Sequence, residues 1–175
     1  GKYVELPDAY KSINESLFQA ATYNDRKLDL QYMHSEKLNS GNVDAMLSSL
    51  DGVLIAPGFG QRGIEGKFIA LKYAREHDIP TFGVCLGMQC MVIEYARDVL
   101  GYTDANSTEM DVTTKHNVID LMEEQKSITN MGGTMRLGAY DCILAEDSID
   151  AKAYGTTHIR ERHRHRFEFN NEYRK

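Results

Sequence analysis

The sequence of 175 residues predicts an α/β fold, a three-layer sandwich in which helices cover both faces of a mostly parallel open sheet. Short apolar runs of strand length alternate with amphipathic helical stretches through the first half of the chain, as in sheets whose strands are buried on both faces. The length is that of one domain, and no linker, repeat or low-complexity segment divides it. We therefore expect a single domain over residues 1–175.

The first half of the chain carries most of this alternation. Residues 1–6 look like the end of a strand, and a helix is expected from Pro7 and Asp8 to about Thr22, because its apolar side chains recur at spacings of three and four. Residues 27–33 alternate between apolar and polar side chains and predict a further strand. The other elements expected here are helices over 43–50, 64–76 and 87–100 and strands over 53–56 and 81–84. In the helix over 87–100, the side chains expected to face inward are Met88, Met91, Val92, Tyr95 and Val99.

The second half has plainer patterns. Strands are expected over 117–122, 142–145 and 158–169, and a short helix over 148–154 that Gly155 ends. Ligands of open α/β sheets bind beyond the carboxyl ends of the strands. Cys85 and the loop after Ala56 each follow a predicted parallel strand, so both should lie at that edge.

Composition and charge exclude several classes of function. The net charge of −6 and the pI near 5.5 argue against nucleic acid or an anionic membrane as a partner. No apolar run approaches the roughly 20 residues needed to cross a bilayer. Three irregularly spaced cysteines are too few for a disulfide framework or a zinc site. We expect a cytoplasmic protein without a metal, a nucleic-acid partner or a membrane segment.

The strongest motif surrounds Cys85, in the stretch Gly-Val-Cys-Leu-Gly. Two glycines at this spacing are typical of a strand-to-helix elbow, where Cβ atoms at Gly83 and Gly87 would collide with the neighbouring backbone. A thiol there lies at a helix N-terminus, whose dipole should lower its pKa, and free N–H groups of the turn could bind an oxyanion. The pattern predicts a cysteine nucleophile; a buried cysteine between two turn glycines is the alternative.

A second candidate is the glycine-dense loop over residues 57–63, directly after the strand expected over 53–56. Its unhindered backbone N–H groups suit a second oxyanion donor. The loop lacks the spacing of a phosphate-binding or dinucleotide-binding motif, and a flexible connector is the alternative interpretation.

Charged side chains could bind a polar substrate. Glu109 could bind an ammonium group, and the three arginines within residues 161–166 share one strand face that suits a carboxylate or a phosphate. A solvated loop and a solvated edge strand are the alternatives. His163 and His165 fall on the opposite strand face and, with no metal-binding or acid–base partner recognisable, are interpreted as hydrogen-bonded polar residues.

With these residues identified, the chain resembles the glutamine amidotransferase domain of the CTP synthases, within the class I, triad-type amidotransferases. The resemblance implies a flavodoxin-like α/β fold. Cys-x-Gly alone is typical of the whole class, whereas the segments at 104–109 and 161–166 are specific to CTP synthases. The segments that carry the resemblance are Gly-Lys-Tyr-Val-Glu-Leu at 1–6, Pro-Gly-Phe-Gly-x-Arg-Gly-Ile-Glu-Gly at 57–66, Cys-Leu-Gly-Met-Gln at 85–89, Asp-Ala-Asn-Ser-Thr-Glu at 104–109, Gly-Gly-Thr-Met-Arg-Leu-Gly at 132–138 and Glu-Arg-His-Arg-His-Arg at 161–166.

The resemblance implies hydrolysis of L-glutamine. Cys85 would attack the side-chain amide carbon, and backbone N–H groups near Gly58 and Leu86 would hold the oxyanion. Ammonia would leave, and water would release glutamate from the glutamyl thioester.

The same resemblance assigns further residues to the glutamine site. Glu109 would meet the α-ammonium group and Arg166 the α-carboxylate, and the charge signs suit both assignments. Gly87, Met88 and Gln89 would complete the substrate-binding segment after the nucleophile.

A longer enzyme is implied as well. In the family, ammonia passes to a synthetase domain that activates UTP with ATP and Mg²⁺, GTP is an activator associated with the loop over 58–65, and the enzyme is a homo-oligomer, a tetramer. The synthetase domain is absent from these residues, and we expect the glutaminase domain itself to be truncated at both ends, with no cofactor of its own. The family's general base, a histidine in a His-Pro-Glu segment, is not present, so this stretch alone should be a poor or inactive glutaminase.

Two other classes of function stay open. A cysteine peptidase or γ-glutamyl hydrolase could use a similar elbow, and ammonia release from free glutamine would distinguish it. A non-catalytic regulatory or assembly module would bind glutamine without turning it over.

Overall fold

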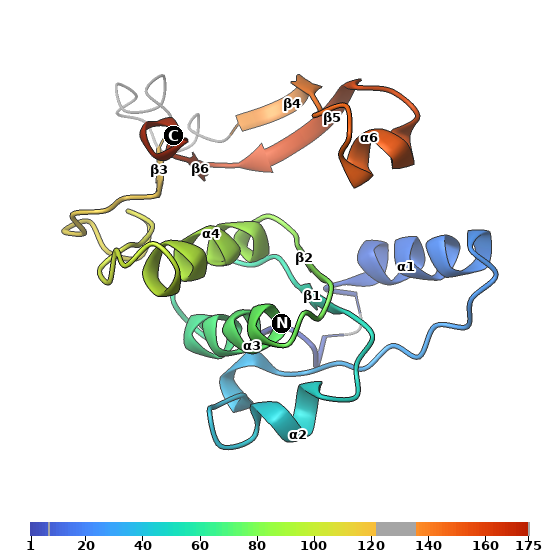
Figure 1. Cartoon of the computed structure of the whole chain (residues 1–175), viewed down its shortest axis with the longest axis horizontal. Helices are drawn as coiled ribbons and strands as arrows, with labels where there is room; N and C mark the ends of the chain where they lie inside the picture. The colour runs from blue at the N-terminus through green and yellow to red at the C-terminus, as the bar shows by residue number, and fades with distance from the viewer. Residues whose placement is uncertain (7, 122–135, 175) are drawn as a thin grey trace.

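Helices α3 and α4 pack side by side next to a pair of parallel strands at the centre of the molecule (Figure 1). The computed structural model describes residues 1–6, 8–121 and 136–174. Strand β1 (Val53–Ile55) runs parallel to β2 (Thr81–Gly83), and α3 (Ile64–Glu76) connects the two. Helix α4 (Leu86–Asp98) follows β2 directly. Parallel strands joined by a helix confirm the predicted α/β class.

The inner face of α4 differs from the expected one. Met88, Tyr95 and Val99 were expected to point inward, but each is more than a third exposed. Leu86, Cys90 and Ile93 are instead fully buried, at spacings of four and three that define the opposite stripe. The tight turn at the start of the helix sets this phase, because it seats the first helical residues directly on β1.

The remaining elements lie on either side of this centre. Among the described residues the strands form three pairs, β1–β2 parallel and the β3–β6 and β4–β5 pairs antiparallel. The elements not yet given are α1 (Lys11–Tyr23), η1 (Ser35–Lys37), α2 (Val43–Leu47), β3 (Ile119–Leu121), β4 (Arg136–Ile143), α6 (Ile149–Tyr154), β5 (His158–His165), β6 (Phe167–Phe169) and η3 (Asn171–Tyr173).

The long strand expected over 158–169 is divided at Arg166. Strand β5 ends at His165 and pairs with β4, whereas β6 begins at Phe167 and pairs with β3. The bend at Arg166 between them faces the start of α4, where the Gln89 side-chain amide donates a hydrogen bond to the Phe167 carbonyl at 2.9 Å. This bend therefore belongs to the site described below.

The strands expected at the N-terminal side are not formed. Residues 1–6 end in a turn, and residues 27–33 take part in no strand ladder, although the Gly1 amino group donates to the Met33 carbonyl at 2.9 Å. A cavity of about 710 Å³ is lined by α1, residues 27–33, β1 and β2, so residues 27–33 have no adjacent strand with which to pair. Helix α1 begins at Lys11, and its expected start at Pro7 lies outside the described residues.

Two further expectations reach the part of the chain that is not described. Most of the segment over 132–138 lies there, and so does the end of the strand expected over 117–122. No helix among the described residues combines the length and the apolar character needed to cross a membrane.

Candidate active site

Cys85 joins β2 to α4 in a strained backbone conformation, with φ 54° and ψ −110°. A positive φ is rare in a residue with a side chain and marks a site that the surrounding structure holds in place. A Cβ atom would lie 2.6 Å from the Met88 nitrogen if added at Gly83, and 2.0 Å from the Ile55 carbonyl oxygen if added at Gly87. The predicted elbow and its need for both glycines are confirmed.

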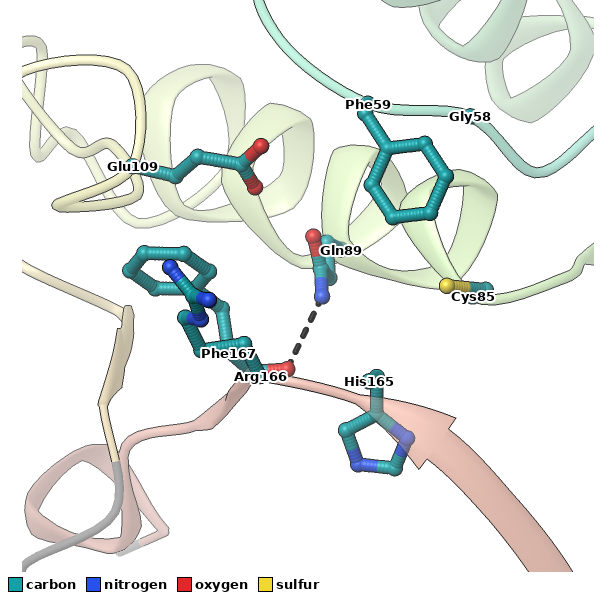
Figure 2. A pocket seen from close by; sticks show the side chains of 8 residues that line it. All are labelled: Gly58, Phe59, Cys85, Gln89, Glu109, His165, Arg166 and Phe167. Atoms are coloured by element: carbon teal, nitrogen blue, oxygen red, sulfur yellow. Dashed lines mark hydrogen bonds between the residues drawn. The ribbon is translucent and has the colours of Figure 1, made fainter. Parts of the chain in front are cut away.

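The elbow opens into a pocket of about 210 Å³ between the start of α4 and the bend at Arg166 (Figure 2). The lining residues come from four separate parts of the sequence, which only the fold brings together. A pocket of this size suits a small polar molecule better than a ligand of drug size, for which about 300 to 1,000 Å³ is usual. Its lining residues are Gly58, Phe59, Cys85, Gln89, Glu109, His165, Arg166 and Phe167.

The structure brings most of the predicted site residues into this pocket. Gly58, Gln89, Glu109 and Arg166 line it together with Cys85. A side chain of each charge sign thus shares one small space with the thiol. An ammonium and a carboxylate on one small ligand would find complementary charges there.

Leu86, Gly87 and Met88, which were also assigned to substrate binding, do not line the pocket. The Leu86 side chain is fully buried in the core, Gly87 is closed in by Ile55, and Met88 points to the surface with 38% of its area exposed. Any part these residues take in binding therefore comes from their backbone groups in the first turn of α4.

His165 was interpreted as a hydrogen-bonded polar residue whose partner the sequence does not reveal, and the structure supplies both the partner and an unexpected place in the pocket. It lines the pocket, and its Nε2 lies 2.5 Å from the Glu168 carboxylate. The alternation rule placed His165 on the face opposite Arg166, but the bend between β5 and β6 brings both to the same pocket. The change from the charged run at 161–166 to the aromatic Phe167–Phe169 is the sequence signal for this break.

The cluster around His165 also holds ligand atoms for a metal. His163, His165 and Glu168 each place one such atom within 4.8 Å of the other two. His165 and Glu168 already form a hydrogen bond with each other, and this bond accounts for their closeness without a metal ion. That the chain carries no metal stays a prediction.

The electrostatic environment of Cys85 differs from the expected one. Burial raises the pKa of the Cys85 thiol, and the Glu109 carboxylate raises it further. The Leu86 backbone N–H and the Lys67 ammonium act in the opposite direction but do not overcome burial. The expectation that the helix N-terminus lowers this pKa below its ordinary value is therefore wrong, because the turn is less exposed than the dipole argument assumed.

Hydrogen bonds fix the loop over residues 57–63. The Lys2 ammonium donates to the carbonyls of Phe59 and Gly60, the latter at 3.1 Å. On the other side, the Gly60 N–H donates to the Glu109 carboxylate at 3.1 Å. The loop is thus held by both its carbonyl and its N–H groups, and Gly58 is kept at the pocket wall rather than in a loose connector.

Comparison with known proteins gives consistent matches. A family model described as glutamine amidotransferase class-I matches residues 5–175. The CTP synthase of Bacteroides fragilis is 71% identical over 175 residues, covering 100% of this chain and 33% of the relative. The CTP synthase of Porphyromonas gingivalis is 67% identical over 174 residues, covering 99% of the chain and 32% of the relative.

A solved structure also matches over almost the whole chain. The Trypanosoma brucei CTPS glutaminase domain with bound acivicin superposes with a TM-score of 0.89 and 40% identity, over 99% of this chain and 67% of that one. The α/β arrangement found here is thus that of a glutaminase domain. The chain spans about a third of the length of the curated relatives it matches.

Proposed function

The chain belongs to the class I glutamine amidotransferases, and from that premise we propose that it is the glutamine-hydrolysing domain of a CTP synthase. One observation carries the proposal. The strained Cys85 elbow opens into the same small pocket as Glu109 and Arg166, which are the charges that free glutamine requires. The high identity to CTP synthases over the whole chain supports the specific enzyme.

Substrate binding follows from the signs of the charges. Glu109 binds the α-ammonium group of glutamine through charge-assisted hydrogen bonds, and Arg166 binds the α-carboxylate end. Gln89 is 4% exposed, and its bond to the Phe167 carbonyl ties α4 to the opposite pocket wall. With its two charged groups bound in this way, glutamine extends its side-chain amide toward Cys85.

Hydrolysis proceeds in two steps. The Cys85 thiolate attacks the amide carbon, and the backbone N–H groups of Leu86 and Gly58 stabilise the tetrahedral oxyanion; one such donor in comparable sites is worth about 3 kcal/mol. The C–N bond breaks, the nitrogen takes up a proton and leaves as ammonia, and a glutamyl thioester remains. Water then cleaves the thioester, releasing glutamate and restoring the thiol.

Proton transfer requires a base beside the thiol. His165 lines the pocket, but its Nε2 is engaged by Glu168, and in Figure 2 its ring projects away from the Cys85 side chain. We therefore assign His165 and Glu168 to holding the pocket wall. The base is the histidine of a His-Pro-Glu segment, as the resemblance implies, and no such segment occurs in these 175 residues.

The proposal includes the longer enzyme of which this domain is a part. The ammonia passes to a synthetase domain of the longer enzyme, which aminates UTP with ATP and Mg²⁺ and responds to GTP. The enzyme is a homo-oligomer and works in the cytoplasm. The lengths of the relatives support a partner domain, since this chain matches only about a third of each.

The test uses the full-length enzyme with two nitrogen sources. Cys85→Ala should abolish CTP formation from glutamine and leave CTP formation from ammonium chloride intact, because only the first depends on the thiol. Cys142→Ser, at an exposed cysteine outside the pocket, should leave both unchanged. Glutamine-dependent synthesis that survives in Cys85→Ala, or cleavage of γ-glutamyl peptides in place of free glutamine, overturns the proposal.

A further inference from the structure

Lys67 is buried beneath the elbow, and the mechanism above does not use it. It lies in the first turn of α3 with 2% of its area exposed, and its ammonium donates to the Ala56 carbonyl at 2.6 Å. No carboxylate forms an ion pair with it among the residues that the structure describes. Burying an ammonium without a carboxylate costs several kcal/mol, so its retention needs a reason.

The register of the two parallel strands places this ammonium close to the nucleophile. Ile55 pairs with Gly83, and the Ile55 carbonyl accepts the Val84 N–H at 3.0 Å. Ala56, the residue directly after β1, therefore lies level with Val84 and Cys85, which directly follow β2. Helix α3 carries Lys67, helix α4 begins directly after Cys85, and the two helices pack side by side (Figure 1).

We infer that Lys67 is a positioning residue of the glutaminase site, whose buried positive charge favours the thiolate form of Cys85 and whose hydrogen bond fixes the start of the loop over 57–63. The inference rests on the proposed function, because it takes Cys85 as the nucleophile. It adds a role for a residue that touches neither the glutamine nor the reacting atoms.

The charges around Cys85 show what a buried positive charge contributes there. Burial and Glu109 both raise the pKa of the thiol, whereas Lys67 lowers it. Two further pocket residues, His165 and Arg166, line the wall opposite α4, at the bend between β5 and β6. Because Arg166 is assigned to the substrate carboxylate, a bound glutamine neutralises it, and the charge beneath the elbow remains.

The charges around Lys67 allow it to act at neutral pH. Burial lowers its pKa to about 8, the Lys2 ammonium lowers it further, and Cys90 and Cys85 oppose the shift. The Gly1 amino group also faces this region, with its own pKa lowered by burial and by Lys67. At pH 7 most molecules therefore hold Lys67 charged, and above pH 8 most do not.

The experiment is a pH profile of Cys85 alkylation in the full-length enzyme. The rate of iodoacetamide reaction is followed on the Cys85 peptide by mass spectrometry, so that other cysteines do not interfere. In the natural enzyme the logarithm of the rate should rise with pH, rise less steeply just above pH 8 as Lys67 loses its proton, and then steepen again, as coupled titrations do.

Two substitutions remove the charge differently. Lys67→Met keeps the length and the apolar stem, and Lys67→Gln keeps a donor for the Ala56 carbonyl. In both, the shallower part of the profile should disappear and the rate at pH 7 should fall about threefold to tenfold, which corresponds to a rise of half a unit to one unit in the thiol pKa. Thermal unfolding of each variant checks that the fold is kept.

The outcomes separate this inference from the proposed function. A single smooth rise in the natural enzyme, or a folded variant with an unchanged rate at pH 7, overturns the role of Lys67; the first result needs no variant at all. Labelling of Cys85 by a glutamine-analogue electrophile tests the proposed function independently. If that labelling fails while the alkylation profile behaves as expected, the substrate assignment falls and the electrostatic role stands.

Discussion

The Glu109 carboxylate accepts a hydrogen bond from the backbone N–H of Gly60, with 3.1 Å between Oε1 and N. The side chain proposed to bind the ammonium group of glutamine therefore also holds the loop that presents Gly58 to the pocket. Lys2 holds the same loop through the Gly60 carbonyl at 3.1 Å. In the proposed mechanism, one carboxylate thus couples substrate recognition to oxyanion stabilisation.

Substitution at Glu109 should separate these two roles. Glu109→Gln keeps an acceptor for Gly60 but loses the charge, so the KM for glutamine should rise about tenfold to a hundredfold, as for a lost charge-assisted hydrogen bond of about 1.5–3 kcal/mol, with kcat little changed. Glu109→Ala releases the loop as well and should lower kcat. Steady-state ammonia release in the full-length enzyme measures both. Equal KM values for the natural enzyme and Glu109→Gln contradict the assignment.

Cys85 should be the cysteine that a glutamine-analogue electrophile labels. Cys90 is fully buried with a pKa raised to about 11, mainly by burial, and Cys142 is exposed but lies outside the pocket. Because burial raises the pKa of Cys85, its thiolate is a minority form at pH 7, and labelling should accelerate as the pH rises toward and past 9. Peptide mapping after brief exposure identifies the site. A label on Cys90 or Cys142 contradicts the assignment of Cys85 as the nucleophile at the elbow.

The elbow should tolerate no side chain at Gly87. A Cβ atom there would lie 2.0 Å from the Ile55 carbonyl oxygen, so Gly87→Ala must move α4 away from β1 and should cost about 3 kcal/mol or more of unfolding free energy. Gly52→Ala is the matched control, because its Cβ would be in ordinary contact, 3.4 Å from the Pro80 carbonyl. Urea denaturation compares the two. Similar losses for both would mean that close packing at the elbow is not the cause.

Local sequence signals predicted the centre of the fold well. The boundaries of β1, α3, β2 and α4 agree with the expected ones within two residues, because apolar spacing and flanking Gly and Pro mark them. The prediction of a strand over 27–33 was wrong, because strand formation depends on neighbours that are distant in the sequence. A strand exists only where a partner lies alongside, and the alternation of 27–33 says nothing about the cavity beside it.

The same difference between local and non-local signals explains which pocket residues were predicted from the sequence and which were not. Cys85 and Gly58 follow strands that were predicted to be parallel and could be placed at one edge by topology alone. His165 could not, because a bend of one residue at Arg166 reverses which face each side chain takes, and strand alternation assumes no such bend. The sign of the Cys85 pKa shift was also missed, since burial depends on segments that meet only in the folded chain.

The buried ammonium of Lys67 should make the domain more stable as the pH rises above 8. Its pKa is about 8 in the folded state and 10.5 in the unfolded chain, so between these values the unfolded state binds more protons and the free energy of unfolding increases with pH, by about 3 kcal/mol at most. Below pH 8 Lys67 is charged in both the folded and the unfolded state, so folding carries the full free-energy cost of burying the ammonium.

Lys67→Met isolates this contribution from the other groups that titrate in the same range. The difference in unfolding free energy between the variant and the natural chain should favour the variant at pH 7, because a neutral side chain of similar length avoids the cost of burying the charge. That difference should shrink between pH 8 and 10.5 and then stay constant. Urea denaturation at several pH values measures it. A difference independent of pH means that Lys67 has the same pKa in the folded and the unfolded chain, so that burial does not penalise its charge and the ammonium is not enclosed beneath Cys85 as proposed.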